Sequence, residues 1–206
     1  DPKNDAKNVL KNDFISDVIY VVYTANIAVK IQIFFNFALK IIMSNIAYIL
    51  LGSNIGDREE VMRNAIAMME SRSCRLIASS YIYETESWGF VTDDVFLNQV
   101  ICIETSLAPH DLLKELLSIE IQLGRDREHH YDTYVSRPID LDILYYNDIV
   151  LNDYDLILPH PKLNLRRFTL MPLCDVAPNM MHPVLCLSNS DLLARCEDTL
   201  MVKRYK

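Results

Sequence analysis

Hydrophobic and polar residues follow two different periods along residues 44–206, and together they predict four strands and two helices. Short runs rich in Val, Ile, Leu and Tyr are typical of strands. Between them, apolar residues recur every three or four positions, which is the spacing of a helix that buries one face. The predicted order is strand-helix-strand-strand-helix-strand. The strands are expected at 47–51, 75–83, 96–104 and in the run after Pro138, with a further hairpin near 149–158.

Capping and turn residues mark where the helices begin and end. Asp57 can cap the first helix, with Glu60 three residues later as its capping-box partner. Pro109 stands in the first turn of the second helix, and Gly124 follows its last apolar position. The predicted fold class is therefore α+β, with a ferredoxin-like βαββαβ core, a mostly antiparallel sheet, helices on one face, and extra C-terminal strands and helices. The extra helices are expected at 166–176 and 191–196.

The composition of the chain changes near Met43. Residues 1–42 contain no Gly, Arg, Glu, Cys, His or Trp, and all four glycines of the chain come later. We therefore expect an N-terminal leader of doubtful function at 1–43 and the working domain at 44–206. The apolar run 18–42 is long enough to span a bilayer, but the Lys, Asn and Gln residues inside it argue against a membrane segment.

Charge and cysteine content narrow the classes of function. The formal net charge of −8 at pH 7 argues against a broad nucleic-acid surface, which needs a basic patch. The five cysteines form no CxxC pair and no metal-ligand spacing. An odd number of cysteines without a signal peptide is typical of reduced thiols in the cytoplasm. The sequence also lacks a P-loop and a GxGxxG dinucleotide motif.

The segment SRPIDLDIL, residues 136–144, contains the main candidate chemistry. Side chains alternate along a strand, so Asp140 and Asp142 share one face while the apolar residues beside them face the other way. Two adjacent carboxylates repel unless a cation lies between them, and Mg²⁺ with substrate phosphates is the usual occupant of such a pair. Arg137 can grip phosphate oxygens beside them. The alternative to metal binding is an acidic pair that simply lies on a solvated strand face.

Two clusters of basic residues flank this segment. Arg125 and Arg127 open a polar loop that ends at Arg137, and arginines on such a loop can close over phosphates. Downstream, His160 follows a proline, and Arg166 begins the sequence Arg-Arg-Phe. The alternative interpretations are that the arginines are ordinary solvated charges and that His160 lies in a surface turn.

Taken together, these motifs closely resemble the 6-hydroxymethyl-7,8-dihydropterin pyrophosphokinase family of folate biosynthesis. The resemblance runs from about Ile46 to at least Val176. Its most specific part is the spacing of G-R-x-R, R-P-x-D-L-D-I and P-H. The matching segments are AYILLGSN, YETESWG, FLNQVICIETSLAPHDLL, IEIQLGRDR, SRPIDLDIL, LPHP and RRFTLMPL.

The resemblance implies a Mg²⁺-dependent ATP diphosphokinase that transfers pyrophosphate from ATP to the hydroxymethyl group of the dihydropterin and releases AMP. It implies two Mg²⁺ ions bound by the acidic pair. We also expect a monomer in the cytoplasm, with no nucleic-acid or membrane partner. The implied catalytic residues are Arg125, Arg137, Asp140 and Asp142. The implied ATP-binding residues are Glu120, Arg127, Tyr134 and His160. The implied pterin-binding residues are Thr85, Trp88, Phe96, Asn98, Arg166 and Phe168.

The sequence departs from the family pattern in two loops. The loop from Arg125 to Arg137 is longer than in the common bacterial form and has Tyr134 where a Trp is expected, and Ser87 replaces a frequent Pro. We still expect this longer loop to close when ATP and pterin are both bound. Two other functions stay open, namely a non-catalytic domain that senses a small molecule and a nucleotidyltransferase that uses the same carboxylates. Release of AMP rather than pyrophosphate separates the kinase from the nucleotidyltransferase.

Deleting residues 1–42 should leave folding and turnover unchanged, because all the candidate chemistry lies downstream of the change in composition. The measurements are the thermal midpoint and the rate of AMP release for the full chain and for the shortened chain. A shortened chain that fails to fold, or membrane association that depends on residues 18–42, would contradict this expectation.

Overall fold

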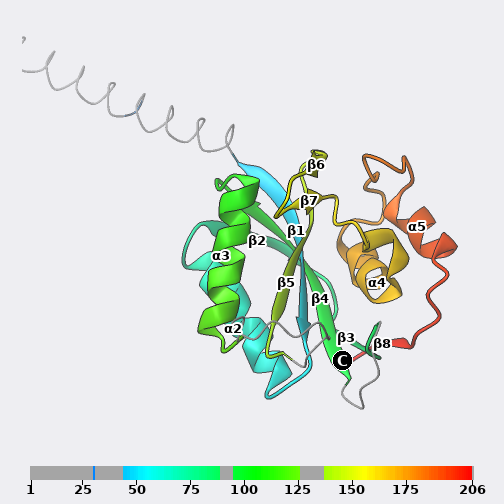
Figure 1. Ribbon diagram of the computed structural model, residues 1–206, viewed down its shortest axis with the longest axis horizontal. Helices are drawn as coiled ribbons and strands as arrows, with labels where there is room; N and C mark the ends of the chain where they lie inside the picture. The colour runs from blue at the N-terminus through cyan, green and yellow to red at the C-terminus, as the bar shows by residue number, and fades with distance from the viewer. Residues whose placement is uncertain (1–29, 31–43, 89–94, 126–136, 206) are drawn as a thin grey trace, which may run out of the picture. The chain divides into compact units, whose positions relative to one another are not determined.

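The computed structural model describes residue 30 and residues 44–88, 95–125 and 137–205. The described residues from Asn45 onward form one compact unit around a six-stranded sheet, in which every strand pair is antiparallel. The strands are β1 (Asn45–Ser53), β2 (Cys74–Ser79), β3 (Tyr83–Thr85), β4 (Phe96–Thr105), β5 (Asp140–Tyr146) and β8 (Val202–Arg204). They neighbour one another in the order β5-β1-β4-β3-β8, and β2 also pairs with β4 (Figure 1).

Two helices, α2 (Arg58–Glu70) and α3 (Pro109–Gln122), cover one face of the sheet (Figure 1). The predicted cap of α2 is confirmed, because the Asp57 carboxylate accepts a hydrogen bond from the Glu60 backbone N at 3.0 Å. Pro109 occupies the first turn of α3, where no intrahelical amide bond is lost. Apolar residues from both helices meet the sheet in the main hydrophobic core. Its fully buried members include Ile49, Met62, Ile101, Leu116 and Ile139.

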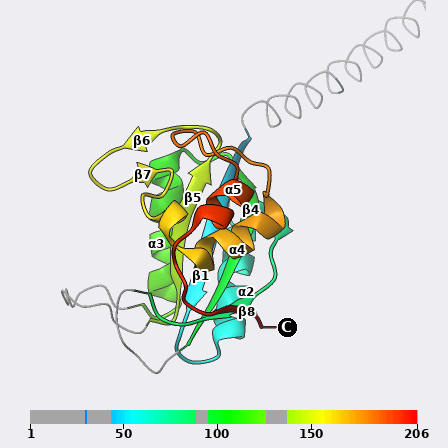
Figure 2. The ribbon, with the colours of Figure 1, turned by 90° about the vertical axis from the view of Figure 1, so that its right-hand side faces the viewer.

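A second hydrophobic layer covers the opposite face. Helices α4 (Arg167–Val176) and α5 (Asn189–Arg195) lie across the sheet from α2 and α3, as Figures 1 and 2 show from two directions. Leu170 of α4 packs with Val100 and Leu144, which the sheet presents on this side. Helices therefore cover both faces, whereas the sequence predicts them on one. The central strands are apolar on both sides, so the C-terminal helices are needed to bury the second side.

The α+β class and the mostly antiparallel sheet are confirmed, and the ferredoxin-like description stays a prediction. The predicted strand 75–83 is divided into β2 and β3, which pair with different parts of β4. The division occurs at Ser80, whose Oγ accepts a hydrogen bond from the Val100 backbone N at 3.0 Å. The predicted hairpin is present as β6 (Leu151–Asn152) and β7 (Ile157–Leu158).

Within residues 44–88, 95–125 and 137–205, no helix has both the length and the apolar character needed to cross a membrane. The apolar run 18–42 lies outside the described residues apart from Lys30. The division of the chain into a leader and a working domain therefore stays a prediction.

Leu116→Ala should lower the free energy of unfolding by about 3 kcal/mol, since it would leave a cavity in the main core. Leu116 of α3 is fully buried. Ile121 lies on the same helix but is 57% exposed, so Ile121→Ala should change the free energy by less than about 1 kcal/mol. Urea unfolding followed by circular dichroism compares the two variants. Similar losses in both would show that α3 does not pack through the face assigned to it.

Candidate functional site

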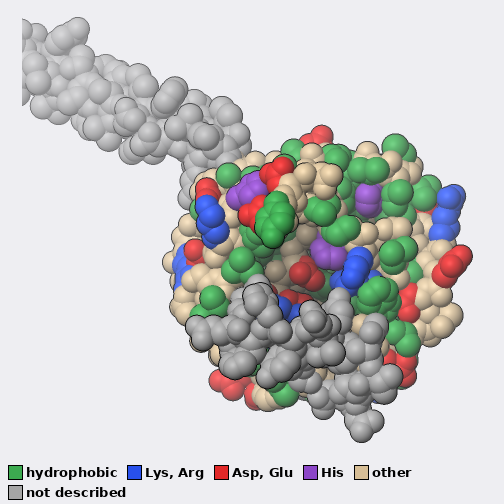
Figure 3. Space-filling model, viewed as in Figure 1, with side chains coloured by type: hydrophobic (Ala, Val, Ile, Leu, Met, Phe, Trp, Pro, Cys, Tyr) green, Lys and Arg blue, Asp and Glu red, His purple; other side chains and the backbone are tan. Residues whose placement is uncertain are grey.

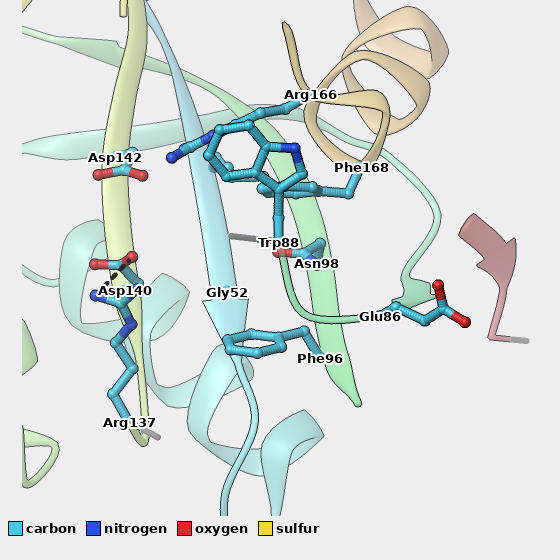
Figure 4. A pocket seen from close by; sticks show the side chains of 11 residues that line it. Gly52, Glu86, Trp88, Phe96, Asn98, Arg137, Asp140, Asp142, Arg166 and Phe168 are labelled. Atoms are coloured by element: carbon cyan, nitrogen blue, oxygen red, sulfur yellow. Dashed lines mark ion pairs between the residues drawn. The ribbon is translucent and has the colours of Figure 1, made fainter. Parts of the chain in front are cut away.

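A pocket lies where β1, β4 and β5 meet the start of α4 and the segment that follows β3 (Figure 4). Acidic, basic and histidine side chains gather around a hollow in this face of the molecule (Figure 3). Most of the predicted site residues within the described segments line the pocket or contact residues that do. The lining residues are Leu50, Gly52, Glu86, Trp88, Phe96, Asn98, Arg137, Asp140, Asp142, Arg166 and Phe168.

Asp140 and Asp142 lie on the same face of β5, and both side chains point into the pocket (Figure 4). The two-residue period of the strand puts them there, while Leu141 between them is buried in the main core. Asp140 forms ion pairs with Arg125 and with Arg137, and its Oδ2 lies 3.3 Å from Arg137 Nη1. The structure thus brings the four predicted catalytic residues together.

The negative charge of Asp142 is less well balanced by nearby cations than that of Asp140. Burial, and then the adjacent charge of Asp140, raise the pKa of the Asp142 carboxyl to about 7, although Arg166 and Arg137 oppose the rise. A bound dication would relieve this repulsion. Among the residues that the structure describes, no three His, Cys, Asp or Glu side chains form a metal cluster. Mg²⁺ often takes only one or two carboxylates and completes its shell with water and substrate phosphates, so the acidic pair fits this ion.

Glu120 is a buried carboxylate next to the acidic pair, with only 1% of its surface exposed. Its Oε1 accepts a hydrogen bond from the Leu141 backbone N and pairs with Arg125 Nη1, each at 2.7 Å. Arg125 in turn pairs with Asp140. Glu120 therefore fixes both the acidic strand and the arginine that faces it. A direct contact between Glu120 and the nucleotide stays a prediction.

Aromatic side chains and one arginine form the other side of the pocket (Figure 4). The guanidinium of Arg166 lies over the ring of Trp88, 4.7 Å from its centroid, and 5.5 Å from the centroid of Phe168. Arg166 is buried, and its Nε has no hydrogen-bond partner among the described residues. A buried donor without a partner is costly, so a ligand that reached this N–H would relieve that cost.

Polar groups on β3 and β4 complete this side. Asn98 Nδ2 donates to Thr85 Oγ1 at 2.7 Å, and both residues are buried. Gly52 lies directly opposite Asn98 in the β1–β4 pairing. A Cβ at Gly52 would stand 3.1 Å from Asn98 Oδ1, which is tight enough to displace the amide. A glycine at this position therefore keeps the Asn98 side chain in place on the pocket wall.

The structure also contains a contact that the sequence does not predict. Asn54 follows β1 and accepts a hydrogen bond from the Arg137 backbone N through Oδ1 at 2.7 Å, while its own backbone N donates to the Arg137 carbonyl at 3.4 Å. The contact holds the entry to β5 beside the end of β1. It depends on the pairing of β1 with β5, which the linear spacing of the motifs does not reveal.

A second cavity adjoins the first, and Asp142 lines both. Its walls come from α3, β5 and the β6–β7 hairpin and are largely apolar, with Leu113, Leu156 and Ile157 among them. His160 also lines this cavity. Burial, and then the charge of Arg166, lower the pKa of His160 to about 4. The imidazole is therefore neutral at neutral pH.

The tautomer of His160 follows from its backbone contacts. Its Nδ1 accepts a hydrogen bond from the Lys162 backbone N at 3.2 Å. In a neutral imidazole the other nitrogen then holds the proton. His160 Nε2 is thus a hydrogen-bond donor without a positive charge, and the contact of His160 with ATP stays a prediction.

Comparisons with known proteins fit this geometry. Residues 48–178 match the model of a family described as 7,8-dihydro-6-hydroxymethylpterin-pyrophosphokinase. The chain belongs to this family. The 2-amino-4-hydroxy-6-hydroxymethyldihydropteridine pyrophosphokinase of Porphyromonas gingivalis is 42% identical over 139 residues, which cover 67% of this chain and 94% of that protein. The enzyme of the same name from Bacillus subtilis is 43% identical over 135 residues, covering 65% of this chain and 79% of that protein.

Solved structures support the fold of the pyrophosphokinase. The wild-type HPPK-DHPS of Plasmodium falciparum with STZ-DHP aligns with a TM-score of 0.60 at 17% identity. The alignment covers 74% of this chain and 43% of that one, so the chain spans less than half of the solved protein. At this level of identity the likeness concerns the fold alone.

Two predicted ATP-binding residues of the pyrophosphokinase, Arg127 and Tyr134, lie outside the described residues. The same holds for most of the loop from Arg125 to Arg137, so its closure over ligands stays a prediction. Glu86 lines the pocket although the sequence does not predict it. The sequence signal that could have indicated Glu86 is its position directly after Thr85, a predicted pterin-binding residue.

Glu120→Ala should lower the free energy of unfolding by about 3 kcal/mol or more, because it leaves the Arg125 guanidinium and the Leu141 amide without their buried partner. Glu120→Gln keeps an acceptor for the amide and should lose less. Chemical denaturation measures both effects. Glu115→Ala, which removes a partly exposed ion pair with Arg72, is the control and should change stability by less than about 1 kcal/mol. A Glu120→Ala variant as stable as this control would contradict the anchoring role.

Proposed function

We propose that the chain transfers the pyrophosphoryl group of ATP to the hydroxymethyl group of 6-hydroxymethyl-7,8-dihydropterin in folate biosynthesis, with two Mg²⁺ ions held by Asp140 and Asp142. The family match and the names of its relatives support the reaction. One observation carries the assignment of the site. Asp142 lines two adjoining cavities of different chemistry. Two substrates bound there would meet at the acidic pair.

The pterin belongs in the cavity with the aromatic side chains. Phe96 and Phe168 would hold the flat ring between them, as aromatic faces hold a planar heterocycle. Thr85 and Asn98 would hydrogen-bond its amide and amine edge, and Trp88 and Arg166 would close the other side. The free Nε–H of Arg166 supports this assignment, because a heterocycle nitrogen or oxygen would satisfy it.

ATP belongs in the second cavity. Its apolar walls from α3 and the β6–β7 hairpin suit the adenine base. His160 can donate through Nε2 to an oxygen of the nucleotide while remaining neutral. Arg127 and Tyr134 would add contacts to ATP from the loop between Arg125 and Arg137. Glu120 would position Arg125, with which it pairs.

The acidic pair and two arginines would handle the triphosphate. Mg²⁺ bound to Asp140 and Asp142 would neutralise the charge of the phosphates. Arg125 and Arg137 already point at this position, since both pair with Asp140. They would hold the phosphate oxygens through planar, bidentate contacts. Phosphates would compete for these guanidinium groups and leave the carboxylates free to bind metal.

The transfer itself needs positioning rather than a protein nucleophile. The hydroxyl oxygen of the pterin forms a bond to the β-phosphorus of ATP, and the bond from that phosphorus to the bridging oxygen of AMP breaks. The hydroxyl proton leaves to solvent or to a phosphate oxygen. The chain's part is to hold the two substrates in line and to shield them from water. We propose that the enzyme does this as a monomer in the cytoplasm.

A product assay tests the reaction. Incubation with ATP, Mg²⁺ and the hydroxymethyl dihydropterin should release AMP and form the pterin diphosphate, and EDTA should abolish the reaction until Mg²⁺ is restored. Release of pyrophosphate would identify a nucleotidyltransferase. Mg²⁺-dependent binding of ATP without any product would favour a small-molecule-sensing domain.

Asp140→Ala and Asp142→Ala should each reduce kcat/KM by about 100-fold or more, because each removes a ligand from an ion that holds phosphate. Asp148→Ala is the matched control, since Asp148 is exposed just after the same strand and should leave turnover unchanged. Circular dichroism checks that all three variants fold. Near-normal activity in both pocket variants would exclude the metal assignment.

A further inference from the structure

The pocket assigned to the pterin is held together by a segment without any predicted site residue. This segment, residues 198–204, contains β8 and is named here the C-terminal strap. It lies beyond residue 178, where the family match ends. The strap contacts both the start of α4 and strand β3. Both elements lead into the aromatic side of the pocket, through Arg166 and Phe168 at α4 and through Glu86 and Trp88 after β3.

The first contact of the strap is at α4. Asp198 Oδ2 accepts a hydrogen bond from the Arg167 backbone N at 2.9 Å. Arg167 stands between Arg166 and Phe168, which both line the pocket. Arg166 is the N-cap of α4 and makes no side-chain cap bond, so the carboxylate of Asp198 supplies one from a distant part of the sequence. A negative charge at this end also suits the helix dipole.

The orientation of that carboxylate is fixed within the strap. Its second oxygen, Oδ1, accepts a hydrogen bond from the Leu200 backbone N at 3.1 Å. Both oxygens of Asp198 are therefore engaged, one by the strap and one by α4. The position of the strap and the position of the first turn of α4 are coupled through a single side chain.

The second contact of the strap is at β3 and the residue after it. β8 pairs with β3 in antiparallel register, with Val202 opposite Thr85. The Met201 backbone N donates to Glu86 Oε2 at 3.3 Å, and the Glu86 backbone N donates to the Met201 carbonyl at 3.4 Å. Figure 4 shows the Glu86 side chain directed away from the aromatic rings, on the side of β8. The strap thus holds the wall that leads into Trp88.

The far end of α4 is anchored independently of the strap. Asp175 accepts a hydrogen bond from the Tyr83 hydroxyl at 3.0 Å and from the Tyr81 backbone N at 3.1 Å. These contacts attach the end of the helix to the start of β3. The end of α4 that lines the pocket depends instead on Asp198.

We infer that the C-terminal strap sets the position of the start of α4 relative to the segment after β3 in the pterin pocket, and that Asp198 is a positioning residue for pterin binding. The inference rests on the proposed function, which assigns the pterin to this pocket. A planar ring held between aromatic side chains requires them at a fixed spacing, and the strap joins the segment of Thr85 and Glu86 to the segment of Arg166 and Phe168. None of the described residues that line the ATP cavity belongs to the strap.

Steady-state kinetics on the full chain test the inference. Asp198→Ala should raise the KM for the hydroxymethyl dihydropterin by about three- to tenfold, the range expected for losing a helix cap, and leave the KM for ATP unchanged. Asp198→Asn keeps an oxygen acceptor for the Arg167 amide and should restore most of the affinity. The control is Asp191→Ala. Asp191 completes the capping box of α5 by accepting hydrogen bonds from the Ser188 backbone N and Oγ, so this variant weakens a helix cap outside the pocket and should leave both KM values unchanged.

The outcomes separate this inference from the proposed function. A wild-type chain that releases no AMP would refute the function. With an active wild type, two results would overturn the inference alone. One is an unchanged pterin KM in Asp198→Ala, and the other is a rise in the pterin KM of Asp191→Ala as large as that of Asp198→Ala. If Asp198→Ala does not fold, hydrogen exchange on the wild type decides. The pterin should then slow exchange of the Arg167 amide and of the β3–β8 amides, and equal exchange with and without pterin would overturn the inference.

Discussion

Two carboxylates on one face of β5 create a repulsion that the residues around them partly balance. Asp140 is paired with two arginines, whereas Asp142 is left with a raised pKa and lines both cavities. The imbalance gives the two residues different properties although they come from one short motif. The two arginines orient Asp140 before any ligand binds. The unbalanced charge of Asp142 favours a cation at the point where the two cavities meet.

The supports of this charged centre are buried and come from the body of the domain. Glu120 reaches from α3 to hold both Arg125 and the backbone of β5, and Asn54 holds the backbone of Arg137 from the end of β1. Each support satisfies a backbone amide, and Glu120 also pairs with the side chain of Arg125. Moving the acidic pair would therefore break backbone hydrogen bonds, which keeps the charges fixed before any substrate arrives.

The central part of the fold and site could be predicted because local rules determine it. The alternation of β5 is sufficient to place Asp140 and Asp142 on one face, and the Asp57 cap follows from three neighbouring residues. Contacts between distant segments could not be predicted. The approach of Gly52 to Asn98 depends on strand register, and the cap that Asp198 gives to α4 joins residues far apart in the sequence. β8 is too short and too polar to show a strand pattern at all.

Two polar groups in this pocket are incompletely satisfied by the described residues. The Nε–H of Arg166 lacks a hydrogen-bond partner among the described residues, and the carboxyl of Asp142 faces another carboxyl. Both arrangements reduce stability in the absence of ligand. A pterin and a metal-bound triphosphate would satisfy these two groups respectively. Each ligand would then stabilise the folded chain as it binds, and both groups lie in the pocket around the acidic pair.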